Sequence, residues 1–194
     1  MTAVNNVLSN FAKANARLKD ARADTGAGSL GWWPPEAEYL VGLAAITVDE
    51  ATFEYRTVPK GKNDQKRPAI KVQCKLQLLE DPDSPNAPRS FMDREFIIPY
   101  DTTGLPTAKG CNFAEQVRIA EERFKGLLCT ALGIAEDGLD NAAAALQQLL
   151  ERHEEKSKAG TFITMKVYTK HREDNKRPGK FYPDVVKYME LHNS

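Results

Sequence analysis

The stretch of sequence that decides the fold class is residues 69–79, Ala-Ile-Lys-Val-Gln-Cys-Lys-Leu-Gln-Leu-Leu. Apolar residues occupy its even positions from 70 to 78, and polar residues occupy its odd positions from 71 to 77. A period of two residues is that of a strand with one face in a core and the other in water. The sequence therefore predicts a strand of a half-exposed antiparallel sheet.

More strands are predicted on both sides of this one. Residues 37–48 alternate in polarity, and residues 52–58 place Phe53 and Tyr55 on one face. A short turn near residues 48–50 would join two strands, or a bulge would bend one long strand. Residues 90–99 predict a further strand after a proline-rich loop at 80–88.

The chain then changes to a helical period. Residues 112–132 carry apolar side chains at steps of three and four, and Gly133 would end that helix. Residues 139–155 predict a second helix. Residues 161–169 return to strand, and a loop at 171–180 leads to a last strand at 181–189.

The order of these elements is strands, helices and then two strands, without alternating βαβ units. A doubly wound parallel sheet is therefore not expected. The order predicts an α+β protein, a β-barrel with helices. More closely, it predicts an OB-fold-like antiparallel barrel with a helical insertion before the last two strands and an N-terminal helical arm.

The arm is expected at the start of the chain. Residues 3–22 place apolar side chains at helical spacing, and residues 23–31 have the composition of a linker. We expect an arm and linker over residues 1–31 and an OB-fold-like domain over residues 32–194. The helix would either pack back on the domain or drive self-association, giving a possible homo-oligomer.

Composition suggests at first that nucleic acid is not the partner. The 194 residues include 27 Lys plus Arg and 27 Asp plus Glu, so the formal net charge is zero. The charge is segregated, however. Residues 56–75 carry +6 and residues 166–180 carry +4, whereas the helical residues 113–155 carry −5. A neutral total is therefore compatible with a basic groove and an acidic opposite side.

The two basic segments fall in the connections that contact oligonucleotides in OB-folds. Cations attract phosphates, and aromatic rings stack on unpaired bases. Tyr55 precedes the first loop, while Tyr168, Phe181 and Tyr182 bracket the second. We expect a nucleic-acid-binding site made of Tyr55, Arg56, Lys60, Lys62, Lys66, Arg67, Lys71, Lys166, Tyr168, Lys170, Arg172, Lys176, Arg177, Lys180, Phe181 and Tyr182.

A plainer interpretation remains for each part. Charged loops between strands are commonly solvent-exposed connections, and tyrosine or phenylalanine on a strand is more often a core residue than a platform for a base. The joint occurrence of both basic segments at paired connections favours binding.

The layout resembles the OB-fold single-stranded DNA-binding proteins encoded by bacteriophages. Four stretches over about residues 32–190 carry the likeness. They are the proline-rich entry and tyrosine-led strand Pro34–Val41, the basic loop and strand Lys60–Leu79, the Leu-Gly helix end Leu127–Gly133, and the closing strands Ile163–Tyr188.

The resemblance implies sequence-independent binding of single-stranded DNA, or of RNA, in phage-type DNA replication or recombination. Replication or recombination proteins would then be possible partners. Many members of this group recruit them through an acidic C-terminal tail, but this chain ends Tyr188-Met-Glu-Leu-His-Asn-Ser194 without an acidic run. Partner binding through such a tail is therefore not expected.

Two other functions stay open. A Mg²⁺-dependent nuclease could use Asp93, Glu95 and Asp101, although no Glu-x-Lys follows the strand that holds the first two. A phage structural or protein-interaction module would suit the N-terminal helix and linker. No phosphate-binding loop, nucleophile elbow or dinucleotide fingerprint occurs, so no enzyme activity and no cofactor are expected.

The compartment is the last expectation. Three widely spaced cysteines form no Cys-x-x-Cys pair, which favours neither a zinc site nor a disulfide framework. No signal peptide and no membrane-spanning run are expected. We therefore expect a cytoplasmic protein, in the host cytoplasm if it is phage-encoded, without membrane partners.

Overall fold

The computed structural model describes residues 7–8, 11, 15–20, 37–55, 65–79, 91–108, 111–174 and 177–192, with residues 171–174 and 177–186 described by their backbone. Its largest unit is a five-stranded antiparallel sheet in the order β3-β2-β1-β6-β7. The strands are β1 (Ala37–Tyr55), β2 (Gln65–Leu78), β3 (Phe91–Pro99), β6 (Ile163–Asp174) and β7 (Arg177–Leu191).

The first strand is one long element of 19 residues. Of the two possibilities left by the sequence, a bent single strand is therefore right and a turn at residues 48–50 is wrong. The irregularity lies earlier, where the register to β2 shifts between Leu43 and Ala45. Such a bulge bends a strand, and β1 pairs with β6 over Ala37–Leu43 and with β2 along most of its length.

The last two strands form a longer hairpin than the sequence indicates. The expected loop at residues 171–180 is wrong, because β6 continues to Asp174 and β7 begins at Arg177. The backbone register pairs Arg172 with Tyr182 and Glu173 with Phe181. A run of charged residues is typical of a loop, but residues on a two-stranded arm can be polar on both faces while the backbone still pairs.

Two helices follow the first three strands, as the sequence predicts. Helix α3 spans Phe113–Leu132, begins where the Asn112 side chain accepts a hydrogen bond from the Glu115 amide, and ends at Gly133 with φ +70°. Helix α4 spans Ala142–Lys158. The sequence did not indicate the 3-10 turn η2 (Glu136–Gly138) or the short pair β4 (Thr107–Ala108) and β5 (Cys111–Asn112).

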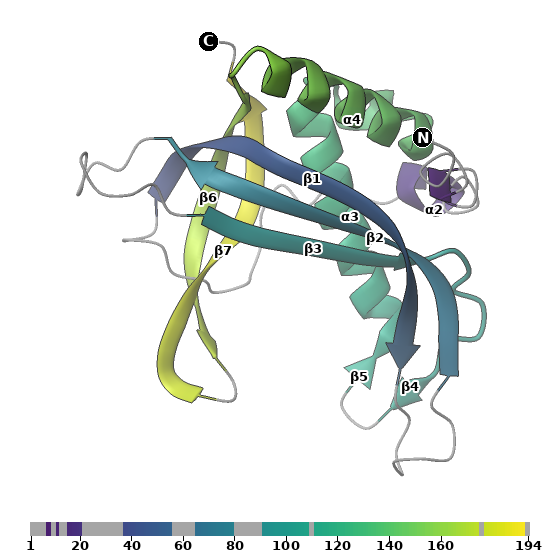
Figure 1. The fold of residues 1–194 in the computed structure, drawn as a ribbon. Helices are drawn as coiled ribbons and strands as arrows, with labels where there is room; N and C mark the ends of the chain where they lie inside the picture. Colours follow the sequence, from purple (N-terminus) through teal and green to yellow (C-terminus); the bar gives the residue numbers. More distant parts are fainter. Residues whose placement is uncertain are drawn as a thin grey trace.

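The sheet curves around α3 without closing into a barrel (Figure 1). Helix α3 contacts both edge strands, β3 and β7, and α4 packs on α3. Within the described residues β3 and β7 do not pair with each other. The α+β class and the helical insertion before the last two strands are thus confirmed, and the strand order is consistent with an OB-like fold. The predicted closure into a barrel is not observed, because α3 lies where the edge strands would have to meet. The helix occupies the opening between the edges of the sheet.

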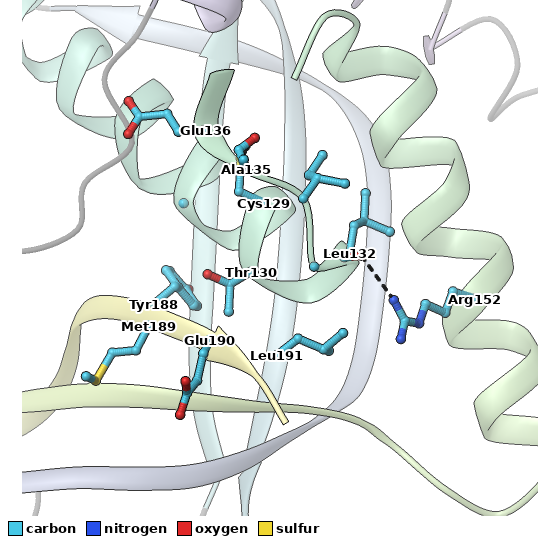
Figure 2. A pocket seen from close by; sticks show the side chains of 13 residues that line it. Cys129, Thr130, Leu132, Ala135, Glu136, Arg152, Tyr188, Met189, Glu190 and Leu191 are labelled. Atoms are coloured by element: carbon cyan, nitrogen blue, oxygen red, sulfur yellow. Dashed lines mark hydrogen bonds between the residues drawn. The ribbon is translucent and has the colours of Figure 1, made fainter. Parts of the chain in front are cut away.

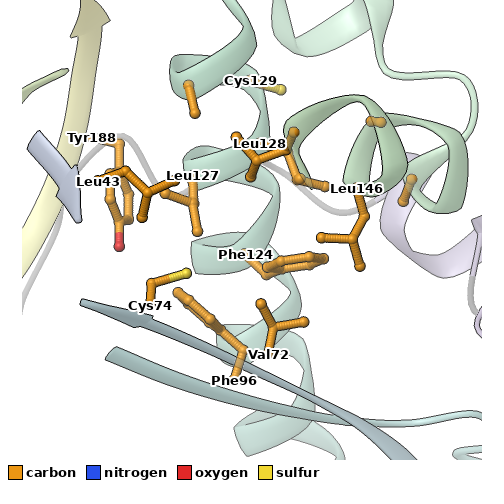
Figure 3. Close-up of a cluster of buried hydrophobic side chains, with 14 of the residues drawn as sticks. Leu43, Val72, Cys74, Phe96, Phe124, Leu127, Leu128, Cys129, Leu146 and Tyr188 are labelled. Carbon is orange, nitrogen blue, oxygen red and sulfur yellow. The ribbon is translucent and has the colours of Figure 1, made fainter. Parts of the chain in front are cut away.

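The core lies between the sheet and the two helices. Figure 3 shows Phe124 of α3 between Phe96 and Val72 of the sheet and Leu146 of α4. The Phe96 and Phe124 ring centroids are 5.4 Å apart. Cys74 belongs to this cluster, and burial raises the pKa of its thiol to about 12. This thiol is therefore not a nucleophile at neutral pH.

The described part of the N-terminal segment packs on the two helices. Helix α2 spans Asn15–Asp20, and Phe11 and Leu18 are fully buried in the common core. Phe11 meets Phe124 edge-on, with ring centroids 5.9 Å apart. Of the two possibilities for this helix, packing on the domain is the one observed. The linker at residues 23–31 lies outside the described residues.

Helix composition gives one further finding. Among the described residues, no helix is both long and apolar enough to cross a membrane.

Candidate nucleic-acid interface

The first half of the candidate interface is the hairpin of β1 and β2. Its described end is the register pair Tyr55 and Gln65. Arg56, Lys60 and Lys62 belong to residues 56–64 and lie outside the described residues. In the chain, this basic segment connects β1 to β2.

Three more candidate residues lie on β2, and each contacts a carboxylate. Arg67 Nη1 lies 3.7 Å from Asp101 Oδ2. Lys66 Nζ lies 2.8 Å from Glu54 on β1. Lys71 Nζ lies 2.9 Å from Glu95 on β3. Because Lys66 is exposed, its pairing has little energetic weight. The hydrogen bond to Glu54 nevertheless raises the pKa of Lys66, so it remains a cation at neutral pH.

Arg67 and Tyr55 form a unit at the base of the hairpin. The guanidinium lies 5.8 Å from the Tyr55 ring centroid, and Nη1 donates to the Asp101 carbonyl at 3.2 Å. The Tyr55 ring packs on Phe113 of α3 at 5.4 Å and is only 3% exposed. A base cannot stack on a covered ring, so we leave Tyr55 out of the proposed contact surface and treat it as a support for Arg67.

The second half is the hairpin of β6 and β7. Ile163, Met165, Val167 and Thr169 are buried, so the alternating residues Lys166, Tyr168 and Lys170 lie on the other face. These are partly exposed. Lys170 Nζ lies 6.0 Å from the Tyr168 ring centroid. A cation beside a partly exposed ring is an arrangement that can take both a phosphate and a base.

Lys166 lies between two carboxylates. Its Nζ is 3.1 Å from Glu190 on β7 and 3.4 Å from Glu38 on β1. The hydrogen bond to Glu190 is the main cause of its raised pKa, and the contact with Glu38 adds to it. Lys166 is therefore a permanent cation whose charge is balanced within the sheet.

The rest of the second basic segment follows the two strands outward. The backbone places Arg172 on β6, and Arg177 and Lys180 on β7. Phe181 and Tyr182 also lie on β7, opposite Glu173 and Arg172. Lys176 is outside the described residues. Sequence reasoning put Arg172, Lys176, Arg177 and Lys180 in a loop, whereas the fold puts Arg172 on β6 and both Arg177 and Lys180 on β7.

The two hairpins extend toward the same side of the molecule, away from α4 (Figure 1). Between them, the polar face of β2 and β3 carries both signs of charge. Lys71 and Gln73 both contact Glu95 there, and Lys75 lies opposite Asp93 in the register. The described polar face of β2 and β3 is therefore of mixed charge and not a basic patch.

The carboxylates considered for a nuclease do not converge. Asp93 and Glu95 are exposed on β3, while Asp101 lies beyond the strand. Hydrogen bonds from the Thr103 side chain and from the Thr103 amide lower the pKa of Asp101, with smaller help from Arg67. The amide donates to Oδ1 at 2.8 Å. Within the residues that the structure describes, no group of three His, Cys, Asp or Glu side chains could hold a metal ion.

Sequence reasoning did not indicate a surface depression at the other end of β7. It has a volume of about 640 Å³ and lies between the C-terminal end of α3, α4 and the last residues of β7 (Figure 2). Arg152 enters it from α4, and its Nη1 donates to the Ala131 and Leu132 carbonyls at 3.2 and 3.4 Å. Because the lining comes from three distant segments, no local sequence signal could have shown it.

These features define the chain as an α+β protein with an OB-type strand order and two basic hairpins. No protein-family model, no curated protein and no solved structure matches it.

Proposed function

We propose that this protein binds single-stranded DNA without sequence preference. The observation that carries the proposal is the strand order β3-β2-β1-β6-β7, which assigns the two basic segments to the β1–β2 and β6–β7 connections. These are the connections that flank the oligonucleotide-binding face of OB-folds. The acidic helical section lies on other elements, so phosphate is attracted to the hairpin side and repelled elsewhere.

We also propose a biological process and a compartment for this binding. A binder of this kind would protect exposed single strands during phage-type DNA replication or recombination, in the cytoplasm where that DNA is found. Tyr168 with Lys170 on β6 is the described arrangement that best suits stacking beside a phosphate. Stacking on aromatic side chains contributes roughly 1–3 kcal/mol per base.

The test is a fluorescence titration of labelled oligo-dT with the full chain at low salt. We expect binding at micromolar protein or below, and an affinity that falls steeply as salt rises because counterions are released. No binding at micromolar protein, or an affinity independent of salt, would contradict the proposal. Competition with an oligo-U strand decides between DNA and RNA.

Charge reversal locates the site. One variant combines Lys60→Glu with Lys62→Glu, and a second combines Lys176→Glu with Lys180→Glu. We expect each double variant to weaken binding. Each lysine that contacts a phosphate of a single strand contributes about 0.7 to the slope of log affinity against log salt, so the loss of two contacts should lower this slope by about 1.4. Lys158→Glu on α4 is the matched control and should change affinity little. Mg²⁺-dependent cleavage of the oligonucleotide would favour the nuclease instead.

A further inference from the structure

The N-terminal helix reaches the end of β3 through one side chain. Arg17 Nη1 donates to the Tyr100 carbonyl at 2.9 Å, and Nη2 donates to the Pro99 carbonyl at 2.5 Å. Its Nε donates to Glu121 Oε1 on α3 at 2.9 Å. Because β3 ends at Pro99, the Tyr100 carbonyl lies beyond the strand, where partners must come from outside the ladder.

The residues that Arg17 holds are bonded in turn to the start of β2. The Tyr100 amide donates to the Pro68 carbonyl at 3.0 Å. The next carbonyl, that of Asp101, accepts from Arg67 Nη1 at 3.2 Å. Since Arg67 lies beside the Tyr55 ring, a continuous set of contacts joins α2 to the base of the β1–β2 hairpin.

The chemistry of this set explains why an arginine stands at position 17. A guanidinium presents its donors in a rigid plane and can bind three acceptors at once, whereas a lysine ammonium is a point charge on a flexible stem. Glu121 is only 5% exposed, so water competes little for its hydrogen bond. Lys125 of α3 also donates from its Nζ to the Lys19 carbonyl at 2.8 Å, and this second hydrogen bond holds α2 against α3.

We propose that Arg17 is a positioning residue that fixes the base of the β1–β2 hairpin and thereby sets the affinity of this hairpin for single-stranded DNA. The effect on affinity rests on the proposed function, while the effect on the hairpin does not. Arg17 itself contacts no nucleic acid in this scheme. It acts through the Pro99–Tyr100 backbone and Arg67.

The experiment compares amide hydrogen exchange and oligo-dT affinity in the full chain. Arg17→Ala removes all three donors, and Arg17→Lys keeps the charge without the planar fork. We expect Tyr100 and residues 66–71 to exchange about tenfold faster in Arg17→Ala, with β6–β7 amides unchanged. Affinity should fall about three- to tenfold. Arg17→Lys should show part of both effects.

Lys19→Ala is the matched control in the same helix. Its Nζ pairs with Asp140 at 3.1 Å, and both side chains are exposed. This variant should leave exchange and affinity as in the unmodified chain. An equal effect from Lys19→Ala would show that any weakening of α2 suffices, which would overturn the assignment to Arg17.

The other outcomes are distinct. Faster exchange confined to α2 and α3, with residues 66–71 unchanged, would overturn the positioning role, as would a changed hairpin with unchanged affinity. If the unmodified chain binds no oligo-dT, the proposed function fails and the exchange data alone decide whether Arg17 fixes the hairpin. Should Arg17→Ala not fold, Arg17→Lys decides the question.

Discussion

At the scale of single residues, three described lysines of the candidate interface are balanced by carboxylates on neighbouring strands. Lys66 pairs with Glu54, Lys71 with Glu95, and Lys166 with two glutamates. Under the proposed function, a phosphate would compete with these carboxylates for the same ammonium groups. The acidic residues of the sheet would then lower the affinity for single-stranded DNA.

This balance gives a prediction at Glu190. Glu190→Gln removes one of the two carboxylates beside Lys166, so the lysine becomes more available to a phosphate. We expect the affinity for oligo-dT to rise by up to about fivefold, the equivalent of an exposed ion pair of about 1 kcal/mol. The measurement is the same fluorescence titration. Glu154→Gln on α4, whose partner is Lys158, is the control and should not raise it. A fall in affinity for Glu190→Gln would contradict this account.

At the scale of elements, the end of α3 is fixed by Gly133. Its φ of +70° is one that L-residues rarely adopt. A Cβ added there would also lie 3.1 Å from Leu191 Cδ2 at the end of β7. The helix terminus and the last strand are thus fitted to each other at this glycine, and the Leu-Gly end seen in the sequence has a tertiary role.

Two glycines with the same positive φ allow the cost of backbone strain to be separated from the cost of the Leu191 contact. Gly160 also has φ +70°, but nothing lies within 4 Å of a Cβ built there. We expect Gly160→Ala to lower the free energy of unfolding by about 1 kcal/mol through backbone strain alone. Gly133→Ala should lower it by more, because Leu191 must also move. Urea denaturation measures both values, and equal losses would show that the Leu191 contact carries no cost.

At the scale of the whole molecule, the N-terminal segment shares one core with the sheet and helices. Phe11→Ala would leave a cavity beside Phe124, and we expect it to lower the free energy of unfolding by about 3–5 kcal/mol. Phe11→Leu keeps most of the volume and should cost less than half as much. Denaturant titration gives these values. A near-zero loss for Phe11→Ala would mean that the segment does not pack on the domain in solution.

Self-association through the N-terminal helix stays a prediction. The buried positions Val7, Leu8, Phe11 and Leu18 are used within the chain, so these side chains are not available to a second copy while the segment is docked. Light scattering of the full chain across a range of concentrations measures the mass directly.

Much of the fold was accessible from local patterns. The alternation at residues 69–79 and the helical period at 112–132 each predict an element with one buried face. In the structure, both elements bury that face in the core. The two last strands were predicted, but their extension over residues 171–174 and 177–180 was missed because the pairing there does not depend on an apolar pattern. The short strands β4 and β5 and the 3-10 turn η2 were not predicted, because an element of two or three residues is too short to show a period of hydrophobicity.

The sequence by itself determined the class of the fold, since the order of strands and helices follows from apolar periodicity that each segment carries alone. It also determined that positive charge collects in two connections. Only the tertiary structure decided that Tyr55 is covered by Phe113, that the lysines of the sheet meet carboxylates, and that Arg17 reaches the end of β3. Those facts depend on segments up to about a hundred residues apart coming together, as Arg17 does with Glu121, and no local pattern encodes a contact between distant side chains.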